Sequence, residues 1–185
     1  MTRVPLVTYE EATGKVKEAF DYQIGKSGSI SNMKRALLND FDTYDVFMGW
    51  YVLWADLLEI LSKREAIIFA HAISTTNGCI LCSLFFISDL KDLGEDPHDF
   101  STSEREALLQ ELGSTIVKDL NGVTDDLIAR LKQHWNDREL TLLVGFAAQM
   151  IATNIFNSVL DVDVDERLTS LIPDFEPVTW RKNNG

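Results

Sequence analysis

Two cysteines, Cys79 and Cys82, are the residues whose types and spacing most directly indicate chemistry. They are the only cysteines among 185 residues and lie in the segment NGCILC. In a reducing compartment, a pair with this spacing is more typical of a redox centre or a metal site than of a structural disulfide. A structural zinc site needs four Cys or His ligands, and the three histidines of the chain are scattered. We therefore expect a reactive dithiol that uses no metal and no other cofactor.

The dithiol is expected at the start of a helix. If Asn77 caps that helix, Cys79 lies in the first turn, where free amides and the helix dipole stabilise a thiolate. Cys82 then lies on the same face, near enough to form a reversible disulfide. A helix terminus supplies about 0.3–1 kcal/mol, whereas each pKa unit requires about 1.4 kcal/mol. The dipole alone is therefore too weak, and a base or a charged partner is needed.

Glu65 is the candidate for that partner. It lies on the preceding helix and would approach the cysteines if the two helices pack antiparallel, and burial can raise its pKa toward about 6–7. The alternative interpretation is that Glu65, three residues after Ser62, does no more than complete a capping box. His71 lies on a different face among apolar neighbours, so we expect a core or interface histidine rather than a substitute base.

Helix start signals recur along the chain in one form, a Ser, Thr or Asn followed three residues later by Glu. No segment alternates between apolar and polar residues as a strand would. The prediction is an all-α bundle of about eight helices, without a substantial sheet, in a single domain over residues 1–185. The expected helices cover about 8–26, 32–39, 42–61, 62–76, 77–93, 101–118 or 103–118 (with Ser101 or Ser103 as the cap), 124–134 and 136–159.

Two helical segments share a pattern of a cap, Arg-Glu and a run of small residues that ends in Thr-Asn. The first opens the predicted cysteine hairpin at about 62–93, and the second is the helix at about 136–160. An internal repeat and shared capping chemistry both explain this likeness. The aromatic residues Phe47, Trp50, Tyr51 and Trp54 are expected in the core or a subunit contact rather than in a substrate pocket.

The net charge and the hydropathy of the chain limit the classes of partner that it is expected to bind. The net charge is −12, from 29 acidic and 17 basic side chains, so nucleic acid and anionic lipid surfaces would be repelled. The beginning of the chain lacks a basic segment followed by an apolar run, and the most apolar stretch is interrupted by Asp56 and Glu59. We expect a soluble, cytoplasmic protein that binds neither nucleic acid nor membrane.

The run LSKREAIIFAHAISTTNGCILC, with the opening RVPLVTYEEATGKVKEAFD and the later FNSVLDVDVDE, resembles the carboxymuconolactone decarboxylase superfamily. Within it, the chain is similar to the alkyl hydroperoxidase D-like proteins, often labelled peroxidase-related, over most of its length. The sharpest motif is a Glu, then Asn-Gly-Cys-x-x-Cys, then a His four residues after the second Cys. The resemblance implies a helical fold that forms homo-oligomers and reduces peroxides or exchanges disulfides without metal or flavin. It assigns peroxide attack to Cys82, disulfide formation to Cys79 and proton relay to Glu65.

The sequence departs from that motif at two points. Phe86 stands at the His position and cannot accept a proton, and Glu65 lies slightly further from Cys79 than the motif places it. The helix dipole favours Cys79 as the more acidic thiol, whereas the resemblance favours Cys82 as the nucleophile. The sequence therefore does not decide which of the two cysteines is the nucleophile, although the family geometry favours Cys82.

Two functions follow from these observations. The first is a thiol-dependent peroxidase or disulfide oxidoreductase that acts on a small-molecule peroxide or disulfide and is reduced again by an external dithiol. The second is a non-enzymatic, oligomeric helical protein or redox sensor, in which the cysteines serve mainly in packing. Phe86 is the residue that favours the second.

Overall fold

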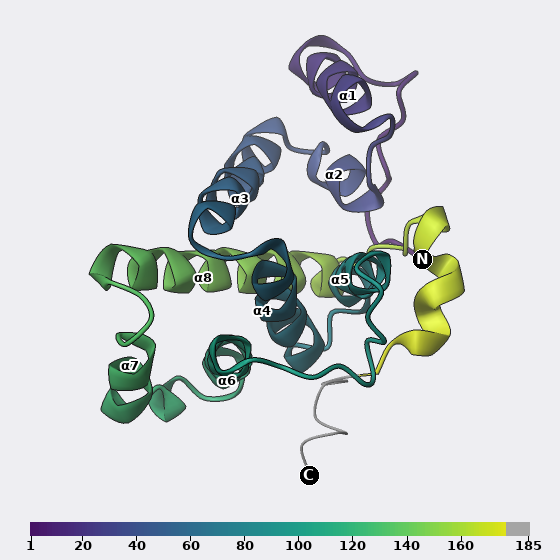
Figure 1. Cartoon of the computed structure of the whole chain (residues 1–185). Coiled ribbons are helices and arrows are strands. Elements are labelled where there is room, and N and C mark those ends of the chain that lie inside the picture. The colour runs from purple at the N-terminus through teal and green to yellow at the C-terminus, as the bar shows by residue number, and fades with distance from the viewer. Residues whose placement is uncertain (177–185) are drawn as a thin grey trace.

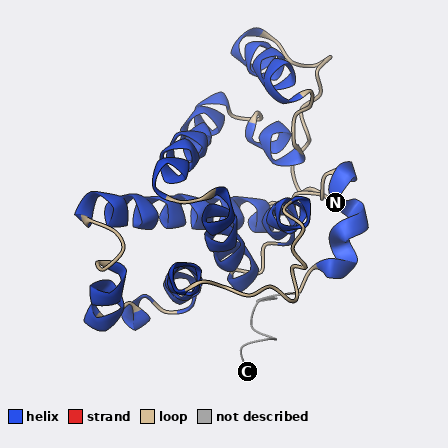
Figure 2. Cartoon of the chain, in the orientation of Figure 1, coloured by secondary structure: helices blue, strands red, loops and turns tan. Residues whose placement is uncertain are grey.

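Helices make up nearly all the regular structure in the computed structural model, which describes residues 1–176 (Figure 1). Figure 2 shows helices and loops, and the single β-type pairing in this part of the chain is a bridge between Asp96 and Asp99. The all-α prediction is therefore confirmed. The elements are α1 (Gly14–Ser27), α2 (Asn32–Leu37), α3 (Phe41–Ile60), α4 (Lys63–Thr76), α5 (Ile80–Asp92), α6 (Glu104–Lys118), η1 (Leu120–Gly122), α7 (Asp125–Leu131), α8 (Asp137–Val159) and η2 (Glu166–Asp174).

Capping residues fix three of the helix starts where the sequence predicts them. Ser62, Ser103 and Asn136 each accept a hydrogen bond from the backbone of the Glu three residues later, and that Glu side chain accepts one from the backbone of the cap. The first helix differs from its prediction. Thr8 does bond the Glu11 carboxylate, but α1 begins only at Gly14, whose φ of 52° interrupts a continuous helix.

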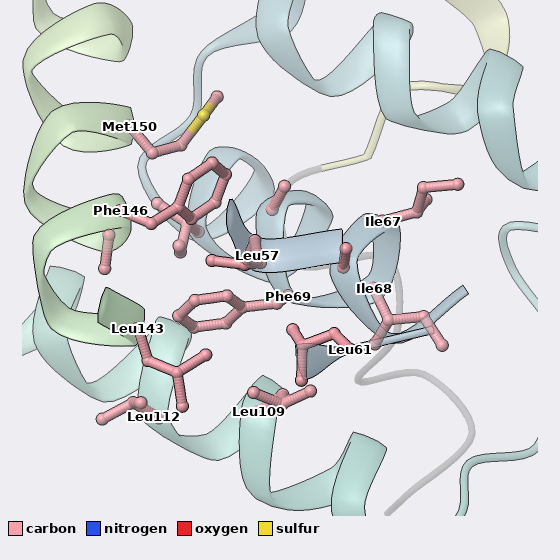
Figure 3. Packing of buried hydrophobic residues seen from close by; sticks show 14 of the residues in the cluster. Leu57, Leu61, Ile67, Ile68, Phe69, Leu109, Leu112, Leu143, Phe146 and Met150 are labelled. Carbon is pink, nitrogen blue, oxygen red and sulfur yellow. The ribbon is translucent and has the colours of Figure 1, made fainter. Parts of the chain in front are cut away.

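The long helix α8 lies at the centre of the main core and packs against α3, α4, α5 and α6 (Figure 1). Phe69 of α4 and Phe146 of α8 are fully buried at its middle (Figure 3). On the other side of α4, α6 approaches closely, because a Cβ at Gly113 would lie only 3.0 Å from the Ile73 side chain. These contacts make α4 a helix buried on nearly every side.

By length and apolar composition alone, α8 is the one helix in residues 1–176 that could cross a membrane. Core helices of soluble proteins have the same properties, and α8 buries Leu143, Phe146 and Ala147 against the helices around it. This packing explains the apolar residues on the buried face of α8.

A second, smaller core joins α1, α2 and the start of α3 around Phe20, Leu37 and Tyr44. The α2 helix also reaches α5, where Ala36 packs in a third cluster with Leu81 and Leu84. The first three helices therefore pack against the main bundle through two contacts, one between α2 and α5 and one between α3 and α8. This arrangement leaves a cavity between them.

Phe146→Ala is expected to lower the free energy of unfolding by about 4 kcal/mol, because it empties a fully buried aromatic site. The Phe146 ring has Trp50, Trp54 and Phe69 as ring neighbours at centroid distances of 5.7, 5.8 and 5.9 Å. Urea unfolding followed by circular dichroism measures the change. Val144→Ala on the same helix, where the side chain is exposed, should change the free energy by less than about 0.5 kcal/mol. Equal losses in the two variants would contradict the packing described here.

Candidate active site

The two cysteines lie at the junction between α4 and α5. Gly78, with a φ of 72°, ends α4, and the Cys79 N–H donates back to the Ser74 carbonyl. Asn77 is therefore the C-cap of α4 and does not cap α5, so the predicted cap is wrong. Cys79 itself is the N-cap, and its sulfur accepts a hydrogen bond from the Cys82 N–H at 3.4 Å. This places the Cys79 sulfur directly on a free amide of the helix start.

The cysteines form a close pair of reduced thiols. Their sulfur atoms are 2.7 Å apart, and both residues are free, with no bond between the sulfurs. The Cys79 and Cys82 side chains belong to the main core, with exposed fractions of 2% and 5%. The spacing predicted from the sequence therefore does bring the two sulfurs together on one face.

Helix α8 supplies the polar neighbours of the pair. Asn157 Nδ2 donates a hydrogen bond to the Cys82 sulfur at 3.2 Å, and the Ser158 hydroxyl lies beside Cys79. Sequence reasoning missed both residues as site residues. They lie in the segment FNSVLDVDVDE that carries part of the family resemblance, which was the available signal.

The two thiols differ in their pKa values. Hydrogen bonds from the Cys82 thiol and amide and from Ser158 lower the pKa of Cys79, although burial opposes this. Burial raises the pKa of Cys82 well above its ordinary value, and a charge on Cys79 raises it further. The first thiolate to form is therefore Cys79, stabilised by the proton that remains on Cys82.

A cavity of about 1570 Å³ opens beside Cys82, between the first three helices and the α5–α8 part of the bundle. Cys82 and Phe86 line it from α5, and Asn157 lines it from α8, whereas Cys79 lies behind this wall. The aromatic residues Phe47, Trp50, Tyr51 and Trp54 line it from α3, and Phe47, Trp50 and Trp54 also pack against the buried cores, as expected. Of the two cysteines, Cys82 is therefore the one that lines the cavity.

The fold is similar to that of a protein of known structure. The crystal structure of an uncharacterized peroxidase-related protein from Silicibacter sp. TM1040 superposes with a TM-score of 0.74 at 16% sequence identity. The match covers 90% of this chain and 93% of that chain. No protein-family model matches the chain. A search of curated proteins gave no match either. This likeness supports the fold of a peroxidase-related protein.

The structure does not bring Glu65 to the cysteines. Glu65 lies in the first turn of α4, and Cys79 follows the other end of this helix of 14 residues, which is about 21 Å long. Burial acts to raise the pKa of Glu65, but bonds from Arg105 at 2.7 Å and from the Ser62 amide at 2.8 Å hold it below its ordinary value. The expected rise toward neutrality is therefore wrong, and Glu65 acts as a cap and an ion-pair partner.

The structure also shows where Phe86 and His71 lie. Phe86 is one turn after Cys82 and is 5% exposed, with its ring 6.3 Å from that of Trp54. His71 is completely buried in α4, and burial lowers its pKa to about 3, so it stays neutral in the core. Within residues 1–176, no three His, Cys, Asp or Glu side chains gather closely enough to hold a metal ion.

Proposed function

We propose that this chain is a thiol-dependent oxidoreductase that reduces an organic hydroperoxide. The observation that carries the proposal is the pair of reduced sulfurs 2.7 Å apart, one on a helix-start amide and the other in the wall of a cavity. The name of the Silicibacter protein, peroxidase-related, supports the same chemistry. The regenerating partner is an external dithiol, and a reducing compartment such as the cytoplasm suits this cycle.

Each cysteine has its own role in the proposed reaction. Cys82 attacks the terminal peroxide oxygen, the O–O bond breaks, and its thiol proton passes to the Cys79 thiolate beside it. The products are the alcohol, protonated from water, and a sulfenic acid on Cys82. Cys79 then attacks that sulfur, the S–S bond forms, and the hydroxyl group leaves as water. In sum, one hydroperoxide and two thiols give one alcohol, one water and one disulfide.

Cumene hydroperoxide added to the reduced native protein tests this function. One equivalent is expected to remove both titratable thiols, lower the mass by two hydrogens and release one equivalent of 2-phenyl-2-propanol. Dithiothreitol should then restore both thiols. Thiols that stay titratable under conditions that oxidise a free reference dithiol would contradict the proposal.

One set of observations favours a second candidate function, a non-enzymatic protein or slow redox sensor in which the cysteines serve mainly in packing. Cys82 is nearly enclosed, its pKa is raised, and Phe86 offers no proton acceptor beside it. For such a protein, the same experiment gives disulfide formation slower than in the reference dithiol and no catalytic turnover with dithiothreitol. The rate of thiol loss therefore separates the two functions.

A further inference from the structure

The cavity beside Cys82 contains a buried ammonium group that the thiol chemistry does not use. Lys34 of α2 lines the cavity and is only 7% exposed. Its Nζ donates to Gln23 Oε1 at 2.6 Å, and Gln23 Nε2 donates in turn to the Tyr44 hydroxyl at 2.8 Å. These three polar side chains from three helices are all buried, so the position of the ammonium is fixed.

This ammonium has no carboxylate partner within 4 Å in residues 1–176. It contacts the Gln23 amide oxygen and the face of the Tyr51 ring, whose centroid is 4.5 Å away. Buried charges in proteins are normally paired, because an unpaired one loses its hydration without compensation. An amide oxygen and a ring face compensate only part of this loss, and two of the three N–H groups of Lys34 remain for a ligand.

A second ammonium converges on the same place. Lys26 Nζ of α1 lies 5.6 Å from the centroid of the same Tyr51 ring and is close enough to lower the pKa of Lys34, after burial the next largest cause. Two like charges near one ring repel each other, and an anion bound at Lys34 would relieve this repulsion. The arrangement therefore favours a negatively charged group at Tyr51.

The acidic residues of the cavity do not fill this role. Four of them are exposed and belong to its outer edge, where water screens them: Glu18, Asp45, Asp56 and Glu166. Asp165 lies deeper and attracts Lys34, but it forms no ion pair with it: one carboxylate oxygen accepts the Asn32 N–H at 2.8 Å, the other is buried without a hydrogen-bond partner, and burial raises its pKa. Asp89 of α5 is also partly buried with a raised pKa. Among the charged residues lining the cavity, Lys34 alone is buried.

The remaining wall suits an apolar body. Trp50 and Trp54 of α3 stack with a centroid distance of 5.2 Å, and Met48 and Phe86 extend the apolar surface toward Cys82. A pocket with apolar walls and one well-placed polar group is the usual form of a small-molecule site. Here the polar group is a cation.

We propose that this cavity binds an anionic amphiphile, a carboxylate or similar anion on an apolar body, with the anion on Lys34 and the apolar body along the aromatic wall toward Cys82. As a statement of substrate class, a hydroperoxide that carries an acid group, the inference rests on the proposed function. As a statement of binding, it stands on the Lys34 site alone.

Two dyes with the same aromatic body test the binding. 8-Anilinonaphthalene-1-sulfonate carries an anion and N-phenyl-1-naphthylamine does not, and both fluoresce when an apolar site takes them up. The sulfonate is expected to bind more tightly than the neutral dye by about tenfold or more, as a charge-assisted hydrogen bond implies. Decanoate should displace the sulfonate dye, and decanamide should not.

Two variants separate Lys34 from general folding effects. Lys34→Met removes the cation, and Gln23→Glu gives it a carboxylate partner within the protein, so each should weaken sulfonate binding by about tenfold. Binding of the neutral dye should change less than about twofold, and Lys118→Met on α6 should alter neither dye, because it lies outside the cavity. Near-ultraviolet circular dichroism confirms that each variant keeps its tertiary packing.

The pH dependence gives an independent readout. Burial lowers the pKa of Lys34 to about 8, with Lys26 acting in the same direction and Asp165 opposing it. The other titratable groups facing this site are Tyr44 and Tyr51, which stay neutral because burial raises their pKa values, and Asp89 of α5. A sulfonate does not titrate in this range, so its affinity should fall about tenfold from pH 7 to pH 9 as Lys34 loses its proton. In Lys34→Met this fall should disappear.

Several results would overturn the inference. They are equal affinity for the two dyes, unchanged sulfonate binding in Lys34→Met, and no binding of either the dye or decanoate at millimolar concentration. A Cys79→Ser/Cys82→Ser double variant keeps the two proposals apart, because it should still bind the sulfonate dye. Binding without peroxide oxidation in the wild-type protein would remove the proposed function only, and oxidation without anion binding would remove this inference only.

Discussion

Cys82→Ser is expected to lower the rate of hydroperoxide reduction by about 10³-fold or more, because it removes the sulfur that attacks the peroxide. Cys82 is the member of the pair in the cavity wall, and Asn157 orients its sulfur through a hydrogen bond of 3.2 Å. A serine hydroxyl at this position is a far weaker nucleophile toward a peroxide oxygen. The measurement is the initial rate of cumene hydroperoxide loss with dithiothreitol as the reductant.

Cys79→Ser should give a different defect from Cys82→Ser. Comparison of the two variants therefore tests the role assigned to each cysteine. Cys82 keeps its place in the cavity, so one round of oxidation remains, although more slowly because the Cys79 thiolate no longer accepts the Cys82 proton. No thiol is then present to resolve the sulfenic acid. A sulfenic acid on Cys82 should therefore accumulate and be trapped by dimedone, while turnover falls. Ser114→Ala, a buried hydroxyl on α6 outside the cavity, should keep the wild-type rate. Trapping on Cys79 in Cys82→Ser, at the wild-type rate, would reverse the assigned roles.

Local chemistry explains why the sequence predicted the helices well. Ser62, Ser103 and Asn136 each carry a Glu three residues later, and a capping box depends only on those four residues. The boxes at Ser62 and Asn136 formed as predicted, and of the two caps expected for α6, Ser101 and Ser103, the structure uses Ser103. The error at the start of α5 is of the same local kind. Asn77 is a good N-cap by residue type. However, Gly78 adopts a left-handed conformation that ends α4 after Asn77, so α5 begins later and its N-cap is Cys79. Cysteine is not usually considered for this role.

Contacts between distant segments explain what the sequence did not reveal. Glu65 and Cys79 are at opposite ends of α4, and the nearby Arg105 that binds Glu65 comes from α6, so neither its place nor its pKa follows from local spacing. The cavity depends on how α1–α3 sit against α5 and α8. Gln23, Lys34 and Tyr44 belong to three helices with no shared motif, so only the fold reveals that they form one network.

Phe86→His is expected to speed peroxide oxidation of the dithiol by about 100-fold near pH 7, because it supplies a proton acceptor other than the Cys79 thiolate. Phe86 is four residues after Cys82 on the same face of α5, and both side chains line the cavity. An imidazole there would take the thiol proton as Cys82 attacks, in place of the Cys79 thiolate, which must otherwise accept it. Stopped-flow measurement of thiol loss with cumene hydroperoxide gives the rate.

The pH profile separates general-base catalysis from a change in packing. In the Phe86→His variant, the rate should rise with pH through the pKa of the new imidazole and then level off, and the ordinary value of about 6.5 is lowered by the apolar surroundings. The advantage over the wild type should shrink at high pH, where the thiols ionise without help. Phe86→Asn opens the same space and adds polarity without a base, so it should give no comparable increase. An equal gain in both variants would show that the phenyl ring limits access of the peroxide to Cys82, and that proton transfer to the dithiol is already sufficient.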